Sequence, residues 1–435
     1  MISIKKGLDL PISGTPVAEL SDTPVVRKAA ILGNDYIGMK PTLLAREGDR
    51  VKVGQKIFED KKNPGVFFTS PCGGTISDIN RGEKRKFLSL EIEIDSNEEF
   101  VEFDTTQSPK DLLINSGLFN SFRTRPFNRT PRINDTPDCI FINACDTNPL
   151  AISPHHIISL NKDEFDAGVN FISSLFSTQT HLTYQDNILD YSYENVESHM
   201  FSGPHPVGLV STHISAIYPV DINRCVWTIG YQEVISIGYL LKNNILRTHK
   251  NIAITGESVF KPSLLSSRIG ANLEELTAGK IGDNSRIISG SVLFGHDAID
   301  AMSYLGFYDN QVSVISNIPN DIFMNWIMPG MTLHSKLNVF ISSFLNPKKF
   351  TFNTSINGGN RAIVPIGSYE EIIPMDILVT QLLKALVVSD IEVATELGML
   401  ELTAEDLALA TYVCPSKYDY CSILMDNLNK VYEEL

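Results

Sequence analysis

Cysteine is scarce in this sequence, and no two cysteines form a C-x-x-C pair. The 435 residues include six cysteines, so we expect reduced thiols and no disulfide framework. The same spacing argues against a cysteine-type zinc site. Cys414 and Cys421 cannot supply the four ligands of an iron–sulfur cluster. The sequence therefore predicts no metal centre.

Positive charge is also in short supply. Lys and Arg number 36 against 51 Asp and Glu, for a net charge of -15. Phosphate contacts need an excess of Lys and Arg, so a nucleic-acid partner is excluded, as is adsorption to anionic lipid.

Long apolar runs are missing as well. The stretch 199–220 contains no Asp, Glu, Lys or Arg, but it holds three prolines and three histidines. A bilayer helix needs about twenty predominantly apolar residues, so we expect a polar, loop-rich segment here and no membrane span. The N-terminus lacks the apolar core of a signal peptide.

The usual nucleotide-binding loops and catalytic sets are absent. No G-x-G-x-x-G and no G-x-x-x-x-G-K-[ST] occurs, so neither phosphate-cradling loop is present in its usual form. No nucleophile elbow is recognisable. His155, His156, His205 and His213 have no acidic cluster at metal-ligand spacing. No catalytic or metal-ligating residue is predicted.

Residues 48–79 have the rhythm of a small two-sheet β-module similar to biotinyl and lipoyl domains. Val51, Val53, Ile57, Phe67 and Ile76 alternate with polar neighbours, as in half-buried strands. Carrier domains present a modified lysine between two methionines on a tight turn. Here Lys61 and Lys62 precede an Asn-Pro-Gly turn and have no methionine neighbour. We expect the scaffold without the modification.

The middle of the chain alternates strands and helices. The pattern predicts strands at 138–144, 225–229 and 251–255, and helices at 163–176 and 231–243. This spacing indicates βαβ units and a largely parallel sheet.

The remaining segments predict a small α+β module at 259–300 and a helical tail. Residues 377–388 are apolar on most of a helical circumference. Ser389-Asp390-Ile391-Glu392 is a capping-box pattern for a helix that Gly398 ends, and Thr403 is expected to open another.

Several long strings resemble the alpha subunit of the sodium-translocating NADH:quinone reductase. They are KKGLDLPISGTP, FEDKKNPGVFFTSP, FRTRPF, SGPHPVGLVSTHI, NRAIVPIGSYEEIIPMDILVTQLL and EDLALATYVCPSKYDY. The resemblance runs the full length. It implies a peripheral subunit on the cytoplasmic face of the bacterial inner membrane, associated with ubiquinone. It also implies partner subunits that carry FMN, riboflavin and the iron–sulfur centre.

A more distant resemblance is to the flavoprotein subunit of respiratory complex I and the Rnf complex C subunit. It implies an α/β multidomain chain with a biotinyl/lipoyl-like barrel-sandwich module (1–100), a Rossmann-like α/β domain (101–258), a small β-grasp-like SLBB module (259–320) and a helical domain (321–435). Those relatives hold flavin on a G-R-G-G-A-G-F-P loop and place N-A-D-E-x-E-P at a strand end. The corresponding residues, 121–127 and 143–149, lack the glycines and the acidic pair. We therefore expect no cofactor bound by this chain.

A quinone head needs an apolar slot with one or two hydrogen-bond donors. Two stretches offer that mix: Leu32, Gly33, Tyr36, Gly38 and Met39 in the first, and Phe122, Arg123, Arg125 and Phe127 in the second. The second lies where the relatives hold flavin, so an inherited cavity could accept a smaller ring. The plain alternative is that Tyr36 and Met39 are core residues and that the arginines form ordinary ion pairs.

Two other functions stay open. One is a docking subunit without a ligand site, for which residues 323–331, rich in Met and Trp, are a candidate contact patch. The other is a soluble NADH- or flavin-binding oxidoreductase, since Arg123 and Arg125 could hold phosphates. Quinone affinity and flavin retention distinguish the three.

Overall fold

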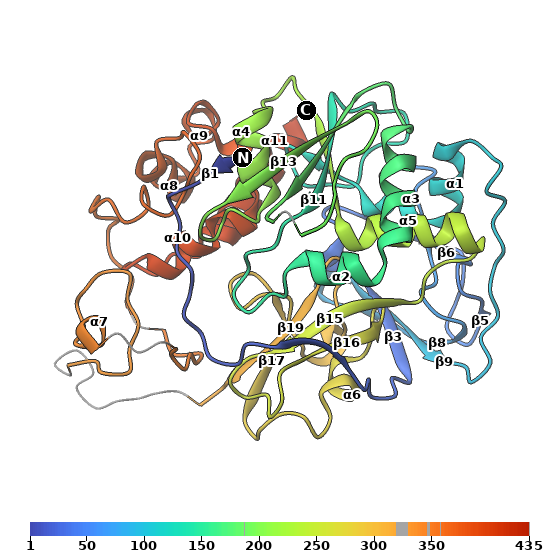
Figure 1. Cartoon of the computed structure of the whole chain (residues 1–435), viewed down its shortest axis with the longest axis horizontal. Helices are drawn as coiled ribbons and strands as arrows, with labels where there is room; N and C mark the ends of the chain where they lie inside the picture. Colours follow the sequence, from blue (N-terminus) through green and yellow to red (C-terminus); the bar gives the residue numbers. More distant parts are fainter. Residues whose placement is uncertain (187, 319–328, 346–348, 357, 435) are drawn as a thin grey trace.

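The structure is a computed structural model of the whole chain, and it describes residues 1–435 except 187, 319–328, 346–348, 357 and 435 (Figure 1). Four sheets carry the described fold, two of six strands, one of four and one of three. Most of the predicted contact patch at 323–331 lies outside the described residues. No helix in the described ranges is both long and apolar enough to cross a bilayer.

The N-terminal module is a pair of small antiparallel sheets. One has the order β3-β9-β8-β5 and the other β4-β6-β7. The strands are β3 (Lys28–Leu32), β4 (Pro41–Leu43), β5 (Arg50–Val51), β6 (Lys56–Asp60), β7 (Phe67–Thr69), β8 (Gly74–Arg81) and β9 (Phe87–Ile94). Val51, Val53, Ile57 and Ile76 are buried as predicted, but Phe68 enters the core in place of Phe67. Lys56 lies over the half-buried Phe67 ring.

The β6–β7 hairpin tip is packed against the rest of the chain. The buried Asn63 side chain donates to the carbonyl of Pro131 over 2.8 Å. Gly65 has a φ of +90°, and a Cβ there would lie 2.5 Å from Ile133. A swinging arm needs a free tip, so this hairpin is built as a fixed contact.

The largest domain is the predicted, largely parallel sheet, in the order β1-β13-β12-β11-β14-β10. Every neighbouring pair is parallel except β14 and β10. The strands are β1 (Ile2–Ser3), β10 (Arg123–Arg125), β11 (Cys139–Ala144), β12 (Gln179–Tyr184), β13 (Val196–Ser202) and β14 (Val226–Gly230). α1 (Pro109–Ser116) packs on β7 and leads into this domain.

Helices cover both faces of this sheet because β11 is apolar on both. Ile140 and Ile142 share a core with α3 (Lys162–Ser173) and α5 (Tyr231–Asn243), and α2 (Pro154–Leu160) packs beside these helices. Cys139 and Phe141 pack on the opposite side against α4 (Val210–Ile217). The predicted loop-rich character of 199–220 was therefore wrong, since α4 and the end of β13 lie within it. Its uncharged side chains fit a buried helix.

The second six-stranded sheet has the order β18-β17-β19-β15-β16-β2. Its members are β2 (Val17–Ser21), β15 (His249–Thr255), β16 (Ser263–Arg268), β17 (Ser285–Ser289), β18 (His296–Asp297) and β19 (Gln311–Ser316), with α6 (Leu273–Thr277). β15 exists as predicted, but it belongs here and not to the parallel sheet. It pairs antiparallel with β16 and parallel with β19.

The tail is helical, as predicted. It contains α7 (Ser342–Leu345), α8 (Val379–Val388), α9 (Ile391–Glu396), α10 (Ala408–Val413) and α11 (Tyr420–Glu434). Asp390, not Ser389, caps α9 by accepting from the Val393 amide, while Ser389 ends α8 in a left-handed conformation. Thr403 and Asp406 form a complete capping box at the turn that leads into α10.

Candidate functional site

A cavity of about 70 Å³ lies where the N-terminal module, the parallel-sheet domain and the second sheet meet. Its walls come from β3 and β7, from α5 and the segment after it, and from loops of the second sheet. The lining residues are Ala30, Ile31, Asp35, Tyr36, Phe68, Thr69, Ser70, Pro71, Gly117, Leu118, Asn120, Gln232, Glu233, Ser236, Leu246, Arg247, Lys250, Ile269, Gly270, Leu305 and Phe307.

Aromatic rings form one wall of the cavity. Tyr36 meets Phe68 edge to face, with ring centroids 4.6 Å apart, and Phe307 at 6.2 Å. Such T-shaped contacts fix ring orientation. The Tyr36 ring is buried, and its hydroxyl makes no hydrogen bond to the described part of the chain.

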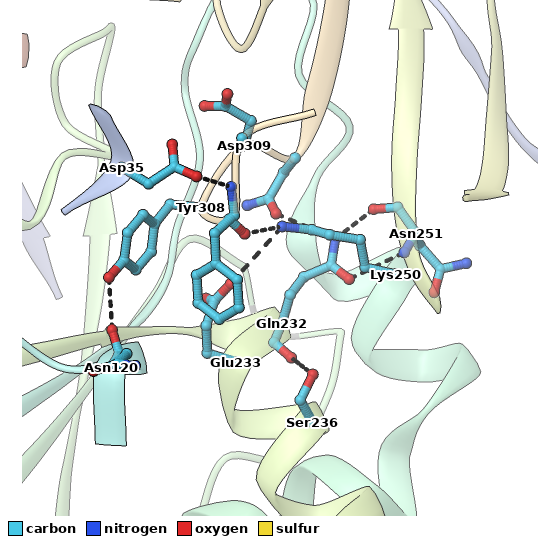
Figure 2. A network of polar contacts seen from close by, with 12 residues as sticks. Asp35, Asn120, Gln232, Glu233, Ser236, Lys250, Asn251, Tyr308 and Asp309 are labelled. Atoms are coloured by element: carbon cyan, nitrogen blue, oxygen red, sulfur yellow. Dashed lines mark hydrogen bonds and ion pairs between the residues drawn. The ribbon is translucent and has the colours of Figure 1, made fainter. Parts of the chain in front are cut away.

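Lys250 brings a buried positive charge to the cavity. It is 3% exposed, donates to the carbonyl of Phe307 over 2.8 Å, and has its Nζ 3.8 Å from Oε1 of Glu233 (Figure 2). Burial lowers the pKa of Lys250, and the Glu233 carboxylate opposes that effect. Gln232 fixes the base of the network by bonding both backbone groups of Asn251. The ammonium is therefore held in place.

Two polar atoms at the cavity have no partner among the described residues. Nη1 of Arg247 is a buried donor, and Oδ1 of Asn120 is a buried acceptor. Their other polar atoms are held, Nη2 of Arg247 by Asn161 and Nδ2 of Asn120 by the Phe67 carbonyl. Unsatisfied buried atoms cost on the order of 1–3 kcal/mol each. A ligand that accepts at one point and donates at another would satisfy both.

Asp35 adds a group that titrates near neutral pH. Its carboxylate accepts from the Phe307 amide over 2.8 Å (Figure 2). Burial raises the pKa of Asp35 to about 6, with a further contribution from the neighbouring Asp309 carboxylate. Asp35 therefore takes up a proton at mildly acidic pH.

The first predicted stretch contributes Tyr36 to the cavity lining. Leu32 is fully buried, and Met39 packs against the large core. Gly33 begins a short 3-10 turn that carries Asp35. Gly38 has a φ of +79° and lies against the Arg129 guanidinium. These four residues shape the loop that holds Tyr36.

The second predicted stretch approaches the same place through Arg123. The Arg123 guanidinium lies over the ring of Tyr308, 3.2 Å from its centroid. Tyr308 in turn lies 6.0 Å from Tyr36 and donates to the Asn120 carbonyl over 2.6 Å (Figure 2). Phe122 is fully buried against Trp227. Arg123 thus forms a layer behind the cavity wall.

Arg125 and Phe127 face the helical tail instead. Arg125 is 6% exposed and bonds Asn128. Burial lowers the pKa of Arg125 to about 10, and the Asp406 carboxylate opposes that effect. Phe127 meets the Tyr432 ring of α11 at 5.3 Å. The two residues therefore belong to the contact between domains.

Three carboxyl groups gather near these arginines, beyond the carboxyl end of β11. Asn148 donates to Glu405 over 3.3 Å, and Asp406 completes the Thr403 capping box. Burial raises the pKa of Asp146 to about 6 and, together with Asp406, that of Glu405 to about 7. The edge of a parallel sheet at its carboxyl ends is where α/β folds commonly bind ligands. Here the tail occupies it.

Sequence reasoning missed Lys250, Arg247, Glu233 and Asn120. One signal was available for Glu233, which follows the predicted strand at 225–229 and so stands at the carboxyl end of a parallel sheet. None was available for Lys250 or Arg247, because a cation beside a strand is usually solvated. The described side chains that could hold a metal are His181, Glu197 and His199, none of which lines the cavity.

Three family models match the chain. They are described as the NqrA N-terminal barrel-sandwich hybrid domain at residues 2–95, the NqrA second alpha/beta domain at 105–246 and the NQRA C-terminal domain at 251–299. These matches accord with the barrel-sandwich and α/β architecture expected from the sequence.

Curated relatives match over the full length. The NqrA subunit of the Na(+)-translocating NADH-quinone reductase of Rhodopirellula baltica is 44% identical over 446 residues, covering 99% of this chain and 98% of that protein. Its counterpart in Haemophilus influenzae is 46% identical over 447 residues, with 100% of both chains covered. Among solved structures, an NAD+-reducing NiFe hydrogenase matches 42% of this chain and 41% of its own at 14% identity and a TM-score of 0.32, which carries no argument.

Proposed function

This chain belongs to the NqrA subunit family of the Na(+)-translocating NADH-quinone reductase, and from that premise we propose that its cavity beside Tyr36 binds the quinone ring. The relatives are named as subunits of an enzyme that acts on NADH and a quinone. The proposal assigns the quinone end to this chain and leaves the sodium path to other subunits.

The observation that carries the proposal is the pairing of an apolar cavity with an unpartnered donor and an unpartnered acceptor. Ligand sites are typically apolar with a few placed polar groups. A quinone ring is flat and offers two carbonyl acceptors, one of which Arg247 Nη1 can serve. The reduced ring carries hydroxyl groups, and the free Oδ1 of Asn120 can accept from one. The same cavity therefore suits both redox forms.

The charges around the cavity support the same ligand. Lys250 and Arg247 place positive charge beside the ring position, which favours a form that has gained negative charge. Asp35, with its pKa raised by burial to about 6, stands at the wall as a group able to hold or release a proton.

A second role, attachment to partner subunits, is favoured by the surface of residues 329–366. Figure 1 shows this segment, with α7, projecting from the body of the molecule. Its apolar side chains are strongly exposed: Met331, Leu337, Val339, Ile341, Phe344, Leu345, Ile356, Val364 and Ile366. Large exposed apolar patches mark protein interfaces. This surface would hold the chain peripherally, at the cytoplasmic face, against the membrane subunits that carry the flavins and the iron–sulfur centre.

Calorimetric titration of the purified chain with a soluble short-chain quinone tests ring binding. We expect a Kd in the micromolar range, on the order of -8 kcal/mol. Arg247→Met should weaken binding about tenfold by removing one hydrogen bond, and the exposed Arg224→Met is its matched control. Ser236→Trp should fill the cavity and abolish binding, because Ser236 lines it from α5. Asn243→Trp places the same bulk on the exposed end of that helix.

The outcome that counts against the proposal is equally specific. Folded wild-type protein that shows no saturable binding up to the solubility limit of the quinone would favour the docking role alone. Binding that Ser236→Trp and Asn243→Trp leave equally intact would place the quinone elsewhere on the chain.

A further inference from the structure

Two histidines and a glutamate meet on one face of the parallel sheet, away from the cavity lining. His181 lies on β12, and Glu197 and His199 lie on β13. The register pairs His181 with Glu197. Residues two apart on a strand share a face, so His199 joins them.

The distances between the three donor atoms match the edges of a coordination tetrahedron. Nδ1 of His181 lies 3.1 Å from Nε2 of His199 and 3.5 Å from Oε2 of Glu197. The third edge, from His199 to Glu197, is 3.7 Å. Zinc bonds of about 2.0–2.1 Å place the ligand atoms of a tetrahedron about 3.3–3.4 Å apart. The three contacts bracket that value.

We propose that His181, Glu197 and His199 form a binding site for a divalent transition metal of the Zn²⁺ class, with water as the fourth ligand. Imidazole nitrogens and a carboxylate oxygen are donors that Zn²⁺ favours. The Glu197 side chain is 59% exposed and that of His199 is 23% exposed, so solvent reaches the fourth position. The ring of His181 is packed on Phe141, with centroids 4.8 Å apart, which fixes one ligand in place.

The protonation of the site agrees with this geometry. Burial lowers the pKa of His181, with His199 adding to the effect, and burial also lowers the pKa of His199. Neutral imidazoles are the forms that ligate metals. A plain hydrogen bond between the two rings is the competing account of the 3.1 Å contact. It predicts a pH-dependent contact without metal affinity.

A bound ion would clasp β12 to β13, next to the pairing of β13 with β1. An ion that binds the folded state alone raises the unfolding temperature as its concentration rises above Kd. The consequence is a metal-dependent stability at this edge of the sheet.

The test is a Zn²⁺ titration of the untagged, chelator-treated full chain by calorimetry. We expect one ion per chain with a Kd on the order of 10 µM, and visible bands of tetrahedral coordination when Co²⁺ is used. Glu197→Gln should weaken binding at least about tenfold, and His199→Asn should abolish it. Both side chains are partly exposed, so folding is preserved.

Two exposed residues provide controls. Glu194→Gln makes the same charge change three residues away, and His156→Asn removes a histidine from the other neighbouring histidine pair. Both should leave Zn²⁺ affinity unchanged. The proposal is overturned if wild type shows no saturable binding up to about 100 µM, or if His156→Asn abolishes binding while His199→Asn does not.

Discussion

Glu405 makes the stability of this protein depend on pH in a direction that a single isosteric change removes. Its carboxyl group is packed between the tail and the end of β11, where it accepts from Asn148. Burial, and then repulsion by Asp406, raises its pKa from an ordinary 4.5 to about 7. The folded state therefore keeps a proton on Glu405 that the unfolded chain has already lost.

The sign follows from proton linkage. Between pH 4.5 and 7 the folded state binds more protons at this residue, so its contribution is full below pH 4.5 and is lost as pH rises through 7. At about 1.4 kcal/mol per pH unit, the ionised group costs about 3 kcal/mol at pH 8. Gln keeps an oxygen for Asn148 and carries no charge. Glu405→Gln should therefore match wild type near pH 4.5 and exceed its free energy of unfolding by up to about 3 kcal/mol at pH 8.

Denaturant unfolding of both proteins from pH 4.5 to 8 measures the difference. Glu396→Gln, on the exposed side of α9, controls for the loss of one negative charge. The reasoning is refuted if the stability difference between Glu405→Gln and wild type stays flat across this range, or if it shrinks as pH rises.

Three further outcomes are expected. Phe344→Asp should release the chain from membranes that contain the partner subunits, whereas Phe260→Asp, at a similarly exposed phenylalanine outside the 329–366 surface, should not; equal retention of both in a sedimentation assay argues against that surface. Gly38→Ala should cost more than Gly48→Ala in thermal unfolding, because both glycines have a left-handed φ but a Cβ at 38 would displace Arg129 while position 48 is open; the shared φ cost is about 1 kcal/mol, and equal losses would mean that Arg129 moves freely. Intact mass from a biotin- and lipoate-replete host should equal the sequence mass, since the hairpin beside Lys61 and Lys62 is docked on Pro131; added biotin or lipoate would show that the tip is free.

The elements that sequence alone predicted best are those whose burial leaves an unambiguous pattern. The helix at 231–243 was predicted with both ends correct, because it follows Gly230 and closes on Asn244 in a left-handed conformation. The strand at 138–144 was predicted because an apolar run buried on both faces has few alternatives. β15 shows the limit: the run at 251–255 is equally apolar in either sheet, and pairing with β16 decides its place.

The site was predictable only in part, because its side chains meet across long sequence separations. Tyr36 and Arg123 both come from predicted stretches, yet Tyr308, far along the chain, is the residue that links them. Arg125 has the same residue type and strand as Arg123, but its partner Asp406 belongs to the tail. His181 and His199 needed the register of two strands, which no linear motif encodes.

The central claim is that the quinone ring binds in the cavity between Tyr36, Arg247 and Lys250. The most direct measurement is an experimental structure of the whole enzyme complex with its quinone bound. The account predicts ring density in this cavity, with a ring oxygen within hydrogen-bond distance of Arg247 Nη1 and the ring against Tyr36 and Phe307. Quinone density confined to other subunits, with only water beside Tyr36, would contradict it.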